Sequence, residues 1–185
     1  MPAGPFEPPP IPVHLVGYPT IGGLVVPFTA LRHLNGKAAL GVVDSSRVER
    51  CLREQRCSVC GLGLTERMVF LMRAFDLARK CSVEPGLCSP CAAYTQAACP
   101  MVAGFMEHYR ETISPFVERC CGDPACSCSL WLPPDKSSAR LGAPAEQWYA
   151  LWTMQYRLGR DPDGRLSADF SGLRVLTIRE IKRTR

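Results

Sequence analysis

The sequence predicts a single α+β domain. Short apolar runs, often β-branched, lie near both ends of the 185-residue chain and are separated by turn residues, as is typical of antiparallel strands. Between them lie two Cys-x2-Cys pairs, a spacing typical of zinc sites. A chain of this length can bury a sizeable core. We therefore expect a domain built on a treble-clef-like zinc core with flanking antiparallel β elements.

The first residues predict a separate arm. Residues 1–12 contain six prolines, which lack backbone donors and favour an extended, polyproline-like conformation. We expect a disordered, proline-rich arm over 1–12, followed by one zinc-stabilised domain over 13–185.

A small antiparallel β unit is expected next. Apolar runs occupy 13–16, 24–31 and 38–43. Asn35-Gly36 separates the last two runs and indicates a hairpin, because both residues tolerate positive φ.

A short helix is expected over 47–55. Asp44-Ser45-Ser46 offers N-cap oxygens, and Glu49 stands three residues after Ser46, as in a capping box. The apolar run 68–75 is expected to form a strand, although its spacing also fits a helix.

The two cysteine pairs give the strongest motif. Cys57 and Cys60 are followed, after 27 residues, by Cys88 and Cys91. A two-residue spacer lets a tight turn aim both sulfurs at one tetrahedral ion about 2.3 Å away. The second pair falls at an expected helix start, where backbone N–H groups stabilise thiolates. We expect these four cysteines to hold a structural zinc ion in a core over about 45–104. Buried free thiols or a redox dithiol are the alternatives.

A second cluster lies at 120–128 and consists of Cys120, Cys121, Cys126 and Cys128. These thiols surround a turn-forming Gly-Asp-Pro and could hold a second zinc ion. Adjacent cysteines point in different directions, so three of them with one distant ligand are an equal alternative. The candidates for that ligand are Cys51, Cys81, Cys99 and His108. An iron–sulfur cluster is disfavoured, because Cys-x2-Cys-x2-Cys is absent.

The other cysteines and the histidines predict little chemistry. Cys51 and Cys99 are expected to pack in the core, and Cys81 to be a free thiol in a loop. His14, His33 and His108 are isolated in the sequence, so each is expected to be an ordinary surface or core residue. The motifs of zinc proteases, P-loop enzymes and serine hydrolases are absent.

The rest of the chain predicts helices and then strands. Helical stretches are expected within 87–102, limited by Pro100, and over 106–119. C-terminal strands are expected over about 147–181, from runs at 148–158 and 173–181. Asp161–Gly164 is a turn sequence between those runs.

Composition favours a reducing compartment. Eleven cysteines cannot all pair within one chain, and the start lacks the basic and apolar segments of a secretory leader. No stretch reaches about 18 apolar residues. We therefore expect a cytoplasmic protein without a membrane span, in which cysteines bind metal more often than they form disulfides.

Residues 23–104 resemble a family of short, uncharacterised proteins of actinobacterial genomes and phages. The matching stretches are GLVVPF, RVERCLREQRCSVCG, MVFLMRAF and SVEPGLCSPCAAYTQAACP. In that family the position of Cys88 is usually histidine, so the resemblance implies a ligand set of Cys57, Cys60, Cys88 and Cys91. It implies a bacterial or phage setting but no activity. The cluster at 120–128 lies outside the shared pattern.

Two functions follow as hypotheses. The net charge of +5 is mild, and basic residues are concentrated in 47–56 and 174–185. The first hypothesis is a non-enzymatic, zinc-stabilised binding protein that presents these segments to nucleic acid or to an acidic protein partner. The alternative is a metalloenzyme with an open zinc site at Cys120–Cys128, where three protein ligands leave a position for water or substrate.

Overall fold

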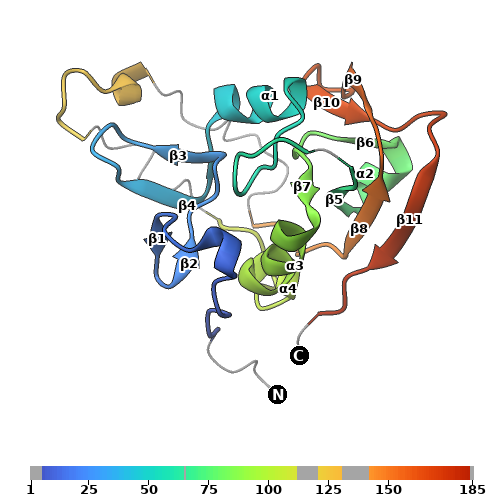
Figure 1. Ribbon diagram of the computed structural model, residues 1–185, viewed down its shortest axis with the longest axis horizontal. Coiled ribbons are helices and arrows are strands. Elements are labelled where there is room, and N and C mark those ends of the chain that lie inside the picture. The colour runs from blue at the N-terminus through green and yellow to red at the C-terminus, as the bar shows by residue number, and fades with distance from the viewer. Residues whose placement is uncertain (1–5, 65, 112–120, 131–141, 184–185) are drawn as a thin grey trace.

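The computed structural model describes residues 6–64, 66–111, 121–130 and 142–183 (Figure 1). Helices and strands are mixed along the chain, and every strand pair in the described residues is antiparallel. The expected α+β class is therefore confirmed.

Two small hairpins form the N-terminal β unit. The first joins β1 (Thr20–Ile21) to β2 (Leu24–Val25), and the second joins β3 (Ala30–Arg32) to β4 (Ala38–Val43). The expected turn at Asn35-Gly36 is confirmed, because Gly36 has a φ of +83° and Asn35 Oδ1 accepts a hydrogen bond from Lys37 N at 3.1 Å.

Two expectations for this unit were wrong. The run 24–31 forms two strands instead of one, because Pro27 between them cannot donate a hydrogen bond to a strand ladder. The run at 13–16 forms a 3-10 turn, η1 (Val13–Leu15), in which Leu15 N donates to Pro12 O at 2.8 Å. In the preceding residues 6–12 there is neither helix nor strand, and the Phe6 ring contacts the Phe105 ring edge-on.

Helix α1 (Ser45–Arg53) begins two residues before the expected start. Asp44 caps it, since its side chain accepts hydrogen bonds from Ser46 N at 2.9 Å and Arg47 N at 3.2 Å. Because Asp44 takes the N-cap position, Ser46 lies inside the helix and does not form the expected capping box with Glu49. Cys51 is buried on the inner face of the helix.

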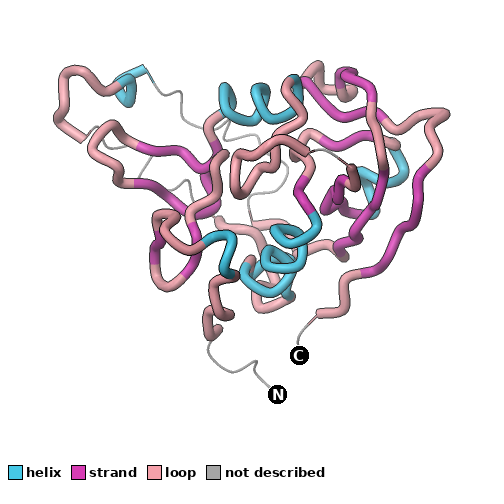
Figure 2. The backbone as a smooth tube through the Cα atoms, viewed as in Figure 1, coloured by secondary structure: helices cyan, strands magenta, loops and turns pink. Residues whose placement is uncertain are grey.

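The main sheet joins distant parts of the chain (Figure 2). Its order is β11 (Val175–Glu180), β8 (Trp148–Thr153), β5 (Met68–Arg73), β7 (Leu87–Cys88). Every residue of β5 is buried. The expected strand 68–75 ends early, at Arg73, because the Asp76 carboxylate accepts a hydrogen bond from Arg73 N at 3.1 Å and starts α2 (Ala74–Arg79).

A second sheet packs near the first. Its order is β6 (Cys81–Ser82), β10 (Leu166–Asp169), β9 (Arg157–Arg160), so Cys81 lies in a strand and not in the expected loop. The run 148–158 is divided between β8 and β9. The expected turn at Asp161–Gly164 is confirmed, since Gly164 N donates to Asp161 O at 2.9 Å. Strand β10, which follows this turn, was not expected.

Two helices follow β7, namely α3 (Ser89–Ala98) and α4 (Pro100–Ala103). Pro100 separates them as expected. The helix expected over 106–119 is absent from 106–111, because Gly104 ends α4 with a φ of +87° and Tyr109 N donates to Ala143 O at 2.8 Å. The rest of that stretch, 112–120, lies outside the described residues.

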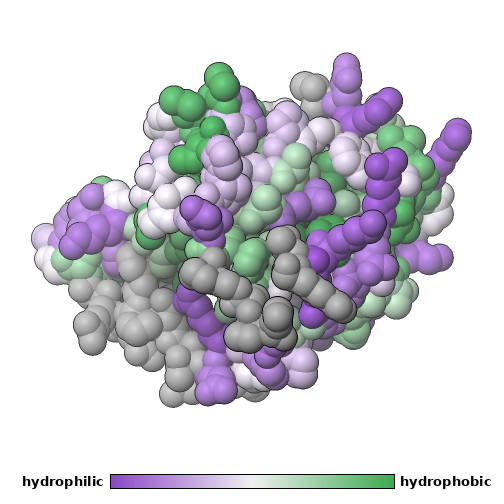
Figure 3. Space-filling view, turned by 90° about the horizontal axis from the view of Figure 1, so that it is seen from below, coloured by the Kyte–Doolittle hydropathy of each residue, from purple (hydrophilic) through white to green (hydrophobic). Residues whose placement is uncertain are grey.

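The core lies between the two sheets and the helices. The Phe70 ring contacts the rings of Tyr156 and Phe170 edge-on, with centroids 5.4 and 4.9 Å apart. Cys57 and Cys91 belong to the same core. On the face in Figure 3, hydrophilic side chains project between smaller apolar areas. None of the helices in the described part of the chain combines the length and apolar character that a membrane span requires.

Candidate metal centres

The first candidate centre is formed by Cys57, Cys60, Cys88 and Cys91. Their sulfur atoms all lie within 4.8 Å of one another. Four sulfurs at about 2.3 Å from one tetrahedral ion are separated by about 3.8 Å, so the observed spacing suits a single ion. Three of the cysteines are buried, and Cys88 is partly exposed. The pairs that the sequence singles out are thus brought together, and this group could hold a metal ion.

The first pair lies on a tight turn. Gly61 N donates to Cys57 O and Cys57 N donates to Leu62 O, both at 2.8 Å. Gly61 has a φ of +73°, and a Cβ on it would lie 2.7 Å from Cδ2 of Phe28. Glycine is therefore required here both for the backbone conformation and for the space beside the Phe28 ring.

The second pair lies where β7 meets α3. Cys88 ends the strand and is the N-cap residue of the helix, Pro90 occupies the first turn, and Cys91 follows. The helix N-terminus favours negative charge at both sulfurs. Ser58 N donates to Gly86 O at 3.0 Å, so a backbone hydrogen bond also joins the segments that carry the two pairs.

Neighbouring groups act on these sulfurs. His14 Nε2 lies 3.3 Å from Cys91 Sγ, and the Tyr18 hydroxyl donates to Cys60 O at 3.1 Å. The thiol of Cys60 donates toward Cys57 and so lowers the pKa of Cys57, while the same contact raises the pKa of Cys60. A cation that binds the four sulfurs would balance the negative charge of their thiolates.

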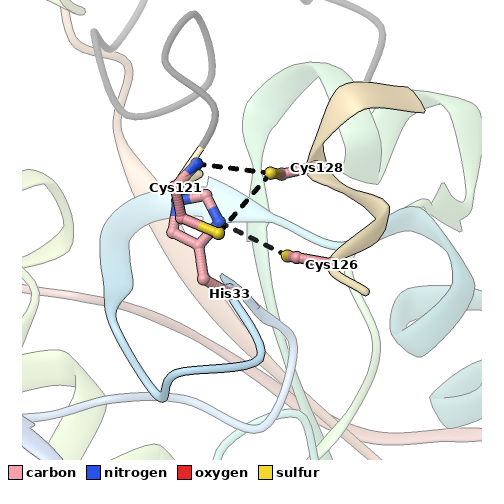
Figure 4. Close-up of side chains that lie close together, drawn as sticks. All are labelled: His33, Cys121, Cys126 and Cys128. Atoms are coloured by element: carbon pink, nitrogen blue, oxygen red, sulfur yellow. Dashed lines mark hydrogen bonds between the residues drawn. The ribbon is translucent and has the colours of Figure 1, made fainter. Parts of the chain in front are cut away.

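The second candidate centre is formed by His33, Cys121, Cys126 and Cys128, whose ligand atoms also lie within 4.8 Å of one another (Figure 4). Cys121 Sγ lies 3.7 Å from Cys128 Sγ, and Cys126 Sγ lies 3.7 Å from His33 Nδ1. This group could hold a second metal ion. Cys120, the fourth cysteine of the expected cluster, lies outside the described residues.

Two separate segments build this centre. In Figure 1 the segment that carries the three cysteines lies beside the tip of the β3–β4 hairpin. Cys126 N donates to Asp123 O at 3.1 Å, which closes the turn between Cys121 and Cys126, and Cys128 lies in η2 (Ser127–Leu130). His33 directly follows β3, where its backbone N donates to Lys37 O at 2.8 Å. The Leu34 backbone N–H and the His33 side chain lower the pKa of Cys126 to about 6.

His33, which the sequence did not single out, lies in the second candidate centre. It is 6% exposed and faces three thiols across 88 to 95 positions of sequence, too far for any motif to link them. A histidine beside an Asn-Gly hairpin signal has a defined place in a turn, but nothing in the sequence indicates what that turn approaches. Only the packing of the hairpin against 121–130 reveals it.

The distant ligands that the sequence suggested lie elsewhere. Cys51 is 1% exposed, and burial raises its pKa to about 11, as expected for a packed, unreactive thiol. Cys99 packs against the core at the end of α3, Cys81 pairs in β6, and His108 is exposed. None of the four belongs to either group of candidate ligands in the described residues.

Comparisons with known proteins give no relative. No family model, curated protein or solved structure matches this chain. The resemblance to the actinobacterial and phage family therefore remains a prediction.

Proposed function

We propose that this chain is a non-enzymatic, zinc-stabilised binding protein with two structural zinc centres. The observation that carries the proposal is that each candidate centre offers four ligand atoms within 4.8 Å. Four thiolates, or three thiolates and one imidazole, are the usual ligand sets of structural zinc. Four protein ligands fill a tetrahedral shell, so a substrate would find no open position.

The first centre supports a treble-clef-like description as part of this proposal. A cysteine turn precedes the buried strand β5, and the second pair of cysteines lies at the start of α3. Cys57 and Cys91 are 0% exposed and belong to the hydrophobic core. A zinc ion bound there would join the turn, strand β7 and helix α3, and its binding free energy would contribute to folding.

The ligands of the second candidate centre argue against the metalloenzyme alternative. An open site at Cys120–Cys128 needs only three protein ligands, but His33 offers a fourth beside Cys121, Cys126 and Cys128. Thiolates also donate so much charge that water on such a zinc ion is a weaker acid than on a three-histidine site. Both arguments favour a structural centre that fastens the hairpin to the later segment.

The basic segment 47–56, which includes most of α1, is a weaker binding surface than its sequence indicates. Each of its arginines lies within 4.0 Å of a carboxylate, in the pairs Arg47–Asp44, Arg50–Glu54, Arg53–Glu49 and Arg56–Glu54. Such exposed pairs add little stability, but they offset the charge that an acidic partner would meet.

The C-terminal tail keeps more of its positive charge. Arg174, Arg179 and Lys182 lie on or beside the edge strand β11, and the described residues form no ion pair with them. We therefore propose that the tail, more than the helix, attracts the acidic partner, whether nucleic acid or protein.

Metal analysis tests the zinc centres. Protein purified without added metal should contain about two equivalents of zinc, one for each set of four ligands. Cys57→Ser should lose one equivalent and much of its thermal stability. Cys51→Ser is a matched control, since it changes a buried cysteine outside both centres, and it should keep both equivalents. Metal-free protein with an undiminished melting temperature would contradict the proposal.

Salt titration tests the partner class. Binding to nucleic acid through phosphate contacts should weaken steeply as salt rises. Substituting Arg179 and Lys182 with alanine should reduce that slope. If the protein binds neither nucleic acid nor an acidic polypeptide at low salt, the binding function is wrong even where zinc is present.

A further inference from the structure

A groove of about 370 Å³ lies beside the first centre. It runs between the segment that follows η1 and the start of the β3–β4 hairpin, and its lining residues are Val16, Gly17, Tyr18, Pro19, Phe28 and Arg32. Its volume is at the lower end of the range of small-ligand pockets, about 300–1,000 Å³. It therefore has room for one planar group and its attached charge.

Arg32 brings an unbalanced positive charge to this groove. Its Nη2 donates to the carbonyl oxygens of Val26 at 3.1 Å and Pro27 at 2.8 Å, but its buried Nε has no partner. No carboxylate in the described part of the chain lies within ion-pair distance of it. Burial and the nearby Arg47 both lower the pKa of Arg32. A half-buried guanidinium without a counterion is costly, and a bound anion would offset that cost.

Two aromatic rings line the same groove, and the cysteine turn fixes both. The Tyr18 hydroxyl donates to Cys60 O, and Phe28 N donates to Val59 O at 2.9 Å. The guanidinium of Arg47 lies 5.5 Å from the centroid of the Phe28 ring, but Asp44 offsets its charge, so Arg32 supplies the unbalanced positive charge of the groove. Aromatic rings beside arginines are the combination with which proteins hold single-stranded nucleic acids, through base contacts and phosphate contacts.

We propose that this groove binds one nucleotide unit of a single-stranded nucleic acid, with the phosphate on Arg32 and the base against Tyr18 and Phe28. The inference rests on the proposed function and narrows its acidic partner to one class. An acidic peptide would satisfy the guanidinium, but it would leave the rings and the exposed Val16 without a planar partner. The first zinc centre then acts as the support that holds the groove in shape.

The test compares two exposed valines of one short segment. Val16 lines the groove and is 69% exposed, whereas Val13 is 90% exposed and does not line it. Each is replaced by glutamate in the zinc-loaded full chain, and binding of a fluorescent oligothymidylate is measured by anisotropy at low salt. Val16→Glu should weaken binding about tenfold or more, because its carboxylate repels the phosphate, while Val13→Glu should stay within about twofold of the unsubstituted protein.

Further measurements distinguish a failure of the groove proposal from a failure of the proposed binding function. Arg32→Ala should weaken binding at least as much as Val16→Glu, and the glutamate pair keeps the test decisive if Arg32→Ala does not fold. Equal effects of the two glutamates would overturn the groove and leave the binding function standing. Binding of polyglutamate without binding of the oligothymidylate would do the same. Binding of neither probe would overturn both.

Discussion

Replacing His33 with alanine removes one of four ligands from the second centre and leaves its hairpin otherwise intact. The turn is held by backbone hydrogen bonds, from His33 N to Lys37 O at 2.8 Å and from Gly36 N to His33 O at 3.0 Å, which do not involve the imidazole. A structural zinc site supplies about 10 kcal/mol or more at neutral pH, so one ligand in four accounts for about 2–3 kcal/mol. That loss corresponds to about a 100-fold weaker affinity for zinc.

Competition with a chromophoric zinc chelator measures this effect. The unsubstituted protein should hold two zinc equivalents tightly, and His33→Ala should hold one tightly and one weakly. The first centre should be unaffected, because its four cysteines lie on other segments. His33→Cys restores a fourth ligand and should recover the second tight equivalent. His108→Ala, which changes an exposed histidine outside both groups, should behave like the unsubstituted protein.

One result would refute the reasoning. If His33→Ala retains two zinc equivalents with unchanged affinity, the imidazole is not a ligand, and another residue such as Cys120 completes the set. The hairpin would then be held against 121–130 by packing alone, and the argument for a closed centre at His33 would fail.

Two further predictions concern the fold. Gly61→Ala should lower the free energy of unfolding by about 2–3 kcal/mol in urea titrations, because Gly61 has a positive φ and a Cβ there would clash with Phe28. Gly22→Ala should lower it by only about 1 kcal/mol, because Gly22 has a φ of +56° but no atom lies within 4 Å of the added Cβ. Similar losses for both variants would contradict the steric argument. Burial raises the pKa of Cys51 from 9.0 to about 11. Between these two pH values the thiol is therefore mostly neutral in the folded protein and mostly ionised in the unfolded protein. The free energy of unfolding should therefore fall by about 2–3 kcal/mol as the pH rises from 9 to 11. Cys51→Ala should remove this part of the fall. If the urea midpoint of Cys51→Ala depends on pH as that of the unsubstituted protein does, Cys51 is not the cause.

The elements that the sequence predicted well depend on neighbouring residues. The Asn35-Gly36 turn requires only that Gly36 adopt a positive φ, and the interruption at Pro100 requires only a missing donor. Errors occurred where a nearby side chain bound a backbone group and so set the end of an element. Asp44, one of three N-cap candidates, capped α1 without the expected Ser46–Glu49 capping box, and Asp76 ended strand β5 at Arg73.

The sequence by itself determined the pairing of Cys57 with Cys60 and of Cys88 with Cys91, because a two-residue spacer fixes where both sulfurs point. It also indicated that strands lie towards both ends of the chain, but not their bounds. Only the tertiary structure decided that β8 lies between β5 and β11, that the arginines of α1 are paired with acids, and that His33 meets Cys121, Cys126 and Cys128. These contacts join segments that are far apart in the chain, or side chains whose orientation depends on packing. The spacing of residues along the sequence therefore does not predict them.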